Sequence, residues 1–334
     1  MKKHYFLLLI MFISLFFLNC NKGKIDPYYK SIIIDATYNY LGSPSQPTLT
    51  INSISINMPI PIATGIDSNG YVYLKLNNIR FQDNSGTYHV LSTPDSITVE
   101  EKTTNLGYTV DVEDTLFAKT TQSLSCVLVL DNSGSLENNV AKIKQDAKSF
   151  IDIVAGASQD SASVGLVVFS TNIRQYPLTK SYTLAKNFID TCVINNSQTA
   201  LFEAVNTGLD ILSMSNAQAQ AIVTFTDGIN NYWGTQTQFS TDAGIIQRLT
   251  GTTAPKISSY SIGFTDNGGV DPIAMNQLAM NGGFYEPSGS YDQIQNIFNK
   301  VANSVASTYT LTYKRNPSII TNKQIRFIIK SQLL

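Results

Sequence analysis

The chain has 334 residues, a length that corresponds to about two domains of ordinary size. Its formal net charge is −1, so it has no basic field to attract a nucleic-acid backbone, and nucleic acid is excluded as the expected ligand. Charged residues make up 14% of the chain, below the ~25% of ordinary soluble domains. Uncharged polar residues must supply the surface instead, which suits an extracellular setting.

The first 20 residues have the layout of a secretory signal. Lys2 and Lys3 precede an apolar run over residues 5–18, which at ~1.5 Å per residue is too short to cross a ~30 Å hydrocarbon core. The run stops before Cys20 and a polar stretch follows, so the segment resembles a bacterial lipoprotein signal with Cys20 as the acylated residue. Asn19 departs from that pattern, in which Gly, Ala or Ser is usual. The alternative is an uncleaved amphipathic anchor with an ordinary cysteine.

This resemblance implies a signal peptide over residues 1–20 and a tether over residues 21–27. Lipid on Cys20 would attach the protein to a membrane of the bacterial cell envelope, and we expect the outer membrane or cell surface. Only Cys126 and Cys192 would then remain in the mature chain. They could form a disulfide, or both could be small buried apolar residues.

Residues 28–122 have the pattern of an all-β, sandwich-like domain of the immunoglobulin or fibronectin kind. Polar and apolar residues alternate in short segments separated by turn residues. The predicted strands are residues 31–40, 48–58, 71–81, 88–91, 96–101 and 107–112. Between two of them, Asn69 and Gly70 predict a hairpin with a type I′ turn, which needs positive φ at both central residues.

Residues 123–307 have a different pattern, in which short continuous apolar runs alternate with helical periodicity. The predicted buried strands are residues 126–130, 164–169, 221–225, 257–262 and 283–285. Apolar residues recur at helical spacing within residues 140–154, 201–212 and 294–305. This alternation predicts a doubly wound, Rossmann-like α/β domain with a mostly parallel sheet.

The tail, residues 308–334, returns to strand alternation. Because the two ends of a doubly wound domain often lie close together, the tail strands could pair with the N-terminal β domain. The α/β domain would then be an insertion in that domain.

A group of oxygen-bearing side chains follows the first buried strand of the α/β domain. Asp131, Ser133 and Ser135 stand at alternate positions of one loop. In open α/β sheets, ligands bind at the carboxyl ends of strands, and a carboxylate with two hydroxyls can converge there on a hard cation. The same residue types are also ordinary turn and helix-cap residues, so the loop alone does not settle the chemistry.

Two downstream residues make the pattern specific. Thr199 precedes a predicted helix, and Asp227 follows the strand predicted at residues 221–225. With Asp131, Ser133 and Ser135, they resemble the metal-ion-dependent adhesion site of the von Willebrand factor type A family. The resemblance covers about residues 123–307 and implies a single Mg²⁺ site, or a Mn²⁺ or Ca²⁺ site, formed by these five residues.

The resemblance also implies a protein ligand that offers an Asp or Glu carboxylate to an open position on the metal. In that family, ligand engagement is coupled to movement of the last helix, here about residues 291–307. Relatives that hold a second ion carry several carboxylates just after the loop. Here only Glu137 is present, so a second site is not expected.

Catalytic motifs are missing. Of the two histidines, His4 lies in the signal, and His89 has no partner at the spacing of a zinc metalloprotease. Neither a nucleophile elbow nor a phosphate-binding loop occurs. We therefore expect a binding protein and no enzyme: a lipid-anchored adhesion or ligand-binding protein, or alternatively a periplasm-facing scaffold or assembly factor that uses the same metal site.

Overall fold

The computed structural model describes most of both predicted domains. The described residues are 31–42, 46–55, 62–77, 79–82, 88–90, 96–103, 107–110, 115–119, 123–157, 161–194, 198–217, 219–231, 242–251, 257–265, 269–306, 308–314 and 320–331. The signal predicted at residues 1–20, its Cys20 and the tether at residues 21–27 lie outside them. Within the described part, no helix is both long and apolar enough to cross a bilayer.

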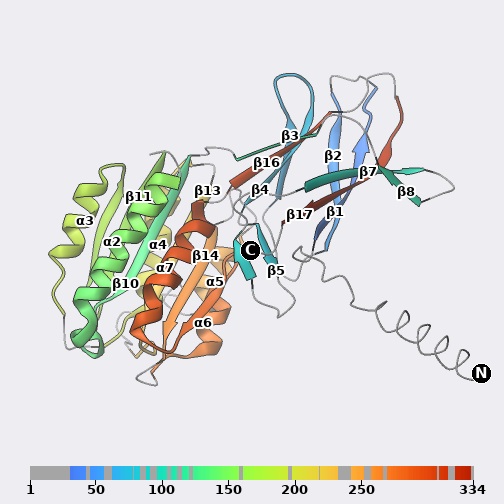
Figure 1. The fold of residues 1–334 in the computed structure, drawn as a ribbon. Helices are drawn as coiled ribbons and strands as arrows, with labels where there is room; N and C mark the ends of the chain where they lie inside the picture. Colours follow the sequence, from blue (N-terminus) through green and yellow to red (C-terminus); the bar gives the residue numbers. More distant parts are fainter. Residues whose placement is uncertain are drawn as a thin grey trace, which may run out of the picture.

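Two antiparallel sheets form the N-terminal unit (Figure 1). One sheet has the order β2-β1-β17-β7-β8, with β1 (Ile32–Asn39), β2 (Thr48–Ser55), β7 (Ser96–Thr103), β8 (Gly107–Val110) and β17 (Lys323–Lys330). The other has the order β3-β4-β16-β9, with β3 (Ile62–Ile66), β4 (Val72–Asn77), β9 (Thr115–Lys119) and β16 (Thr308–Tyr313). A separate hairpin joins β5 (Arg80–Gln82) to β6 (Tyr88–Val90).

The two larger sheets share one apolar core. Residues of β1 are buried at every second position, because successive side chains of a strand point to opposite faces. These residues belong to one cluster with side chains of β4, β16 and β17. The ring of Tyr313 meets the rings of Tyr38 and Phe327 edge to face, with centroids 6.2 and 5.9 Å apart. This shared core makes the unit a β-sandwich.

The C-terminal strands are internal members of the sandwich. β17 pairs with β1 on one side and β7 on the other, while β16 lies between β4 and β9. In the β9–β16 pair, Lys119 stands opposite Tyr309. The chain therefore leaves the sandwich after β9 and returns beside the same point, with the α/β unit between these two paired strands.

The hairpin between β3 and β4 differs from the expected type I′ turn. Gly70 has a φ of 83°, but Asn69 is not among the described non-glycine residues with positive φ. The N–H of Gly70 donates to the carbonyl of Asp67 at 3.1 Å, and the Asp67 carboxylate accepts from the N–H groups of Asn69 and Tyr71. The prediction was wrong because this carboxylate stabilises a longer turn in which glycine alone takes the left-handed position.

The second unit is built on a six-stranded sheet with the order β12-β11-β10-β13-β14-β15. Its strands are β10 (Leu124–Asp131), β11 (Ala162–Phe169), β12 (Ile173–Thr179), β13 (Ala219–Thr226), β14 (Ile257–Phe264) and β15 (Tyr285–Ser288). Every neighbouring pair is parallel except β11 and β12. The predicted α/β fold with a mostly parallel sheet and an N-terminal β domain is confirmed.

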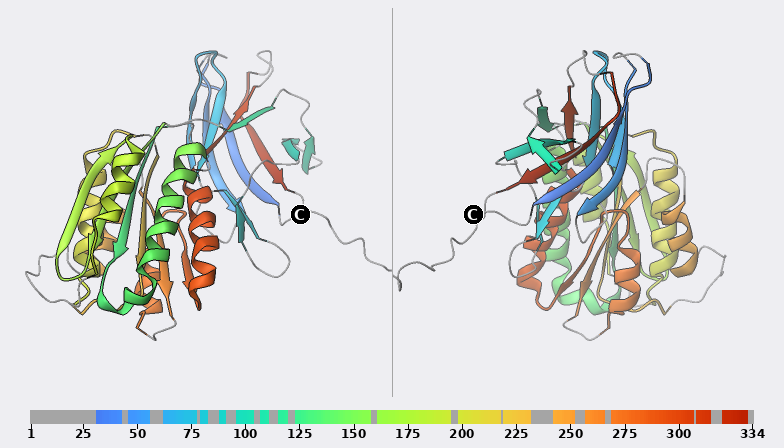
Figure 2. Two further views of the ribbon diagram at one scale, coloured as in Figure 1. Left: turned by 60° about the vertical axis from the view of Figure 1, so that its left-hand side comes forward. Right: turned by 90° about the vertical axis from the view of Figure 1, so that its right-hand side faces the viewer.

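Helices cover both faces of this sheet (Figure 2). The helices α2 (Val140–Ala157), α3 (Tyr182–Asp190) and α7 (Tyr291–Ala306) pack on one face, and α4 (Leu201–Ser213), α5 (Asp242–Thr250) and α6 (Pro272–Leu278) on the other. All eight residues of β10 are buried, with alternate side chains in the two cores. A short 3₁₀ helix, η1 (Gly134–Asn139), precedes α2.

The two remaining cysteines are not bonded to each other. Cys126 and Cys192 are free, buried thiols in the same apolar core. Burial raises the pKa of both thiols, although the nearby charges of Arg174 and Lys144 lower that of Cys192. The sequence allowed either a disulfide or two small buried apolar residues, and the structure shows the second.

The direction of the parallel strands determines at which end of the α/β unit their carboxyl-end loops lie. β10 begins only a few residues after β9 leaves the sandwich, so the amino ends of the parallel strands face the sandwich. Their carboxyl ends therefore lie at the far end of the unit, which is the end where ligands bind in open α/β sheets.

Candidate metal centre

The candidate residues gather where β10 and β13 end. Asp131 is the last residue of β10, and Asp227 directly follows the last residue of β13. These two strands are parallel neighbours, so their outgoing loops meet at one edge of the sheet. The loop after β10 turns at once into η1. Ser133, which precedes η1, and Ser135 within it lie toward the loop of Asp227.

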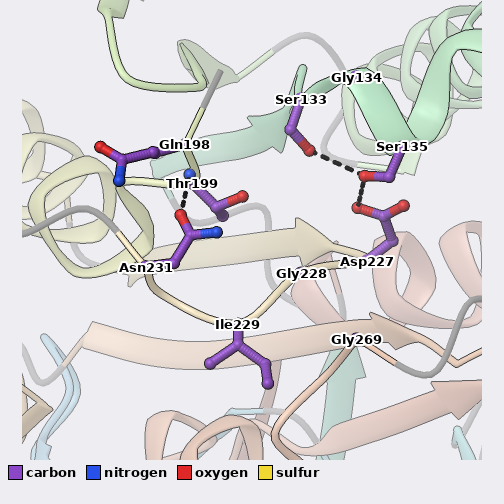
Figure 3. A pocket seen from close by; sticks show the side chains of 10 residues that line it. All are labelled: Ser133, Gly134, Ser135, Gln198, Thr199, Asp227, Gly228, Ile229, Asn231 and Gly269. Carbon is purple, nitrogen blue, oxygen red and sulfur yellow. Dashed lines mark hydrogen bonds between the residues drawn. The ribbon is translucent and has the colours of Figure 1, made fainter. Parts of the chain in front are cut away.

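Three side-chain oxygens form a continuous array (Figure 3). The hydroxyl oxygens of Ser133 and Ser135 are 3.2 Å apart, and the Ser135 hydroxyl donates to Oδ1 of Asp227 at 2.9 Å. Neighbouring ligands around an octahedral Mg²⁺, at about 2.1 Å from the ion, are themselves about 3 Å apart. The array therefore has the spacing that adjacent ligands of one ion require.

Asp131 lies beneath this array. The side chain is 4% exposed and is not part of the pocket surface. Its Oδ1 accepts from the N–H of Ser133 at 2.8 Å, and its Oδ2 accepts from the hydroxyl of Thr226 at 2.5 Å. Both oxygens thus hold backbone and strand ends in place, which positions the Ser133 loop.

The surroundings of Asp131 also set its ionisation. Its pKa is raised to about 6, chiefly by burial and to a smaller extent by the nearby charge of Asp227, while the hydrogen bonds from Thr226 and Ser133 act in the opposite direction. Two carboxylates in one desolvated place repel each other. A cation bound between them would relieve that repulsion.

Thr199 reaches the same pocket from the opposite side, just before α4. Thr199 is buried. Its N–H donates to Oδ1 of Asn231 at 2.6 Å, and the N–H of Asn231 donates to the carbonyl of Thr199 at 3.1 Å. The neighbouring Asn230 accepts from the N–H of Phe202 in the first turn of α4 at 3.3 Å. The loop after Asp227 therefore fixes the start of α4.

Glycines let these loops approach closely. A Cβ added to Gly228 would lie 3.0 Å from the Thr199 hydroxyl, and one added to Gly269 would lie 2.8 Å from the carbonyl oxygen of Asp227. The second contact is with backbone, which cannot move aside cheaply. These two glycines therefore allow the loops that carry Thr199, Asp227 and Gly269 to pack against one another.

The resulting pocket has a volume of about 660 Å³. It is lined by Ser133, Gly134, Ser135, Gln198, Thr199, Asp227, Gly228, Ile229, Asn231 and Gly269. The structure thus brings four of the five candidate residues to one surface and places the fifth, Asp131, directly behind it.

The donor set suits a hard cation. Hydroxyls and a carboxylate are oxygen ligands of the kind that Mg²⁺ and Ca²⁺ take, and neither thiol nor imidazole lines the pocket. Among the described residues, no group of three or more His, Cys, Asp or Glu side chains could hold a metal. A metal at this place would therefore depend on neutral hydroxyls for much of its protein shell.

Two supporting residues were not found from the sequence. Thr226 accepts from the N–H of Gly228 at 3.0 Å while it donates to Asp131, so it joins both carboxylate loops. Asn231 holds Thr199 through the pair of bonds described above. Thr226 could have been identified from the sequence, because it is a hydroxyl residue directly before Asp227. No local sequence pattern pairs Asn231 with Thr199.

Comparisons with known proteins identify one family and several solved structures of low sequence identity. The family model for the von Willebrand factor type A domain matches residues 126–300. No curated protein matches the chain. Proximal thread matrix protein 1 from the mussel byssus, in a structure with a zinc-occupied MIDAS motif, matches with 18% identity and a TM-score of 0.45, over 60% of this chain and 50% of that one. This chain thus spans half the length of the mussel protein.

Two bacterial pilus proteins match as well. The pilus adhesin SpaC from Lactobacillus rhamnosus GG, in its open conformation, matches with 13% identity and a TM-score of 0.46, over 88% of this chain and 44% of that one. The PilB minor pilin from Streptococcus sanguinis matches with 12% identity and a TM-score of 0.45, over 83% and 88%.

Proposed function

The chain belongs to the von Willebrand factor type A domain family, and from this premise we propose that it binds a partner protein through a divalent metal ion. The ion, Mg²⁺ or a similar hard cation, is held at one site by Ser133, Ser135, Thr199 and Asp227, and Asp131 behind them supplies the second negative charge. A carboxylate of the partner completes its shell. The chain acts by binding and not by catalysis.

The spacing of the oxygen array carries this proposal. Ser133, Ser135 and Asp227 already stand at the separations of 3.2 and 2.9 Å that adjacent ligands of an octahedral ion need. Little reorganisation would therefore be required when the ion enters. When bound, the ion supplies a positive charge and an open coordination position.

The other residues of the site act on position. Asp131 accepts from the N–H of Ser133 and from the hydroxyl of Thr226, so it ties the Ser133 loop to the end of β13. Asn231 keeps Thr199 turned to the pocket by holding both its N–H and its carbonyl. The pocket, with a volume of about 660 Å³, leaves room for the side chain of a partner.

We further propose that the protein works in the bacterial cell envelope, attached through lipid on Cys20. The sequence of the first 20 residues supports this part. The metal site lies at the end of the α/β unit that faces away from the sandwich, so it would be presented outward from an anchor on the N-terminal side. Replacing Cys20 with Ala should shift the protein from the detergent phase to the aqueous phase, and unchanged partitioning would contradict lipid attachment.

Calorimetric titration with Mg²⁺ tests the metal site. We expect one site in the full-length chain, a higher melting temperature with Mg²⁺ and no binding in Asp131→Ala. Asp152→Ala is the matched control, because Asp152 is an exposed aspartate on the surface of α2. Equal titration of the wild type and Asp131→Ala would show that the metal binds elsewhere.

A further inference from the structure

Side chains from other elements hold the chain where it leaves α3. The last carbonyls of a helix, and those just beyond its end, have no helical N–H to accept from. Here each of the four carbonyls of residues 190–193 accepts a hydrogen bond from a side chain. Lys144 donates to those of Asp190 and Cys192, Arg174 to that of Thr191, and Asn132 to that of Val193. The α3 exit, as we call residues 190–193, is therefore held from α2, from β12 and from the loop after β10.

Two of these donors are cations. Lys144 lies on α2 and Arg174 on the edge strand β12. Positive charge at the carboxyl end of a helix is favourable, because the helix dipole places partial negative charge there. The Arg174 guanidinium donates to the hydroxyl of Thr191 at 3.1 Å and lies over the ring of Phe188, 5.1 Å from its centroid. Both cations thus stabilise the end of α3 together with its exit.

The third donor, Asn132, also belongs to the loop of the proposed metal ligands. It stands between Asp131 and Ser133 in the chain. Its N–H donates to the carbonyl of Phe169, the last residue of β11, at 2.7 Å, and its side-chain amide donates to the carbonyl of Val193. Asn132 therefore ties the loop after β10 both to β11 and to the α3 exit.

The α3 exit leads toward Thr199. Only residues 194–198 separate Val193 from Thr199 in the chain, so the position of the exit limits where Thr199 can lie. After Thr199, the N–H of Ala200 donates to the carbonyl of Ser170, directly after β11, at 3.0 Å. Thr199 is thus held from both sides, and Asn132 acts on the side that comes from α3.

We propose that Asn132 is a positioning residue for the metal site, an inference that rests on the proposed function. By fixing the α3 exit, its side chain keeps the chain before Thr199 against the Ser133 loop, so the hydroxyls of both loops are in place before an ion enters. The Asn132 amide need not contact the ion for this role. Lys144 acts on the same exit from α2 and is a second positioning residue, farther from the site.

Charge and position predict opposite effects for Lys144. Replacing it with Met removes a positive charge from the end of the sheet where the cation would bind. By charge alone, Lys144→Met should strengthen Mg²⁺ binding, because like charges repel. As a positioning residue, Lys144 should instead weaken Mg²⁺ binding when it is removed. The sign of the change therefore separates the two roles.

Calorimetric titration of the full-length chain with Mg²⁺ measures this sign. Residues that orient metal ligands change metal affinity by about 10- to 100-fold when removed, and we expect about a tenfold loss in Asn132→Ala. Lys144→Met should show a smaller, severalfold loss. The double variant should bind little worse than Asn132→Ala, because both changes release the same exit.

Lys186→Met is the matched control for Lys144→Met. Lys186 also joins α3 to α2, but its ammonium pairs with the exposed carboxylate of Asp152 at 2.7 Å instead of with the carbonyls of the α3 exit. This variant should keep the wild-type affinity for Mg²⁺. An equal loss in both lysine variants would show that any contact between the two helices matters, which would overturn the role of the exit.

Hydrogen exchange tests the positioning in the metal-free chain. The N–H groups of Thr199 and Ala200 donate to Asn231 and Ser170 at 2.6 and 3.0 Å, so they report how firmly this stretch is held. Both should exchange faster in Asn132→Ala, while the amides of β13 keep their rate. Faster exchange throughout the sheet would indicate a general loss of stability and would overturn the local role.

The failure of this inference differs from the failure of the proposed function. Tighter or unchanged Mg²⁺ binding in Lys144→Met, wild-type affinity in Asn132→Ala, or unchanged exchange at Thr199 and Ala200 would each overturn the positioning role. A wild-type chain that takes up no Mg²⁺ would overturn the proposed function instead. Exchange in the metal-free chain would then decide by itself whether Asn132 fixes the stretch that carries Thr199.

Discussion

Thr226 is the residue whose replacement tests the internal support of the metal site. Its hydroxyl donates to Oδ2 of Asp131 at 2.5 Å and accepts from the N–H of Gly228 at 3.0 Å, and the side chain is fully buried. Thr226→Val keeps the shape but leaves the buried Asp131 carboxylate oxygen and the N–H of the half-buried Gly228 without this partner. Each such loss costs about 1–3 kcal/mol, so the free energy of unfolding should fall by about 2–6 kcal/mol.

Metal binding should weaken too, although Thr226 does not line the pocket. Residues that orient metal ligands change affinity by about 10- to 100-fold when removed, and we expect that range for Mg²⁺ in Thr226→Val. Urea unfolding measures the first effect and calorimetric titration the second. Thr226→Ser keeps the hydroxyl and should stay close to the wild type in Mg²⁺ affinity. A valine variant that binds Mg²⁺ as tightly as the serine variant would refute the role assigned to this hydroxyl.

Three further predictions concern stability, each checked by urea unfolding. Tyr285→Phe should stabilise the fold by roughly 1 kcal/mol, because the buried Tyr285 hydroxyl has no hydrogen bond in the described structure; a loss of stability would mean that it has a partner. Cys126→Ser should cost about 1–3 kcal/mol, since it puts an unpaired hydroxyl in the core, and a neutral result would contradict that burial. The bidentate bond from Arg326 lowers the pKa of Asp35, so its stabilisation is present above the ordinary pKa of an aspartate and is lost as the pH falls through the lowered value. Asp35→Asn should therefore cost up to about 1 kcal/mol at pH 7 and nothing in strong acid, and an equal cost at both pH values would exclude the ion pair as the cause.

The sequence predicted the buried elements of the fold better than the exposed ones. Strands such as β10 and β13 are apolar throughout because both faces are covered, and that pattern is visible without any structure. The edge strand β12 was missed because Arg174, Gln175 and Pro177 interrupt any apolar pattern. Its place is set by backbone pairing with β11, which leaves no periodic trace.

The same division holds within the site. Five ligand candidates could be predicted because each follows a recognisable strand or precedes a helix, and the structure brings Ser133, Ser135, Thr199 and Asp227 to one pocket. Their identity as metal ligands stays a prediction. The support given by Asn231 depends on a loop that folds back across the pocket to Thr199, a contact between residues 32 positions apart. Sequence spacing alone does not encode such a contact.

The balance of charge in the pocket explains why hydroxyls suit a binding site of this kind. One carboxylate, that of Asp227, lines the pocket, and the second, that of Asp131, is turned to Ser133 and Thr226. A divalent ion held mainly by neutral hydroxyls would keep much of its positive charge, and it could share that charge with a carboxylate from outside. A site with several carboxylates would hold the ion more tightly but would leave less attraction for a partner. Lys144 and Arg174 lie at the same end of the sheet, where they donate to the carbonyls of Cys192 and Thr191, so the charge left on the ion would add to theirs in attracting an acidic partner.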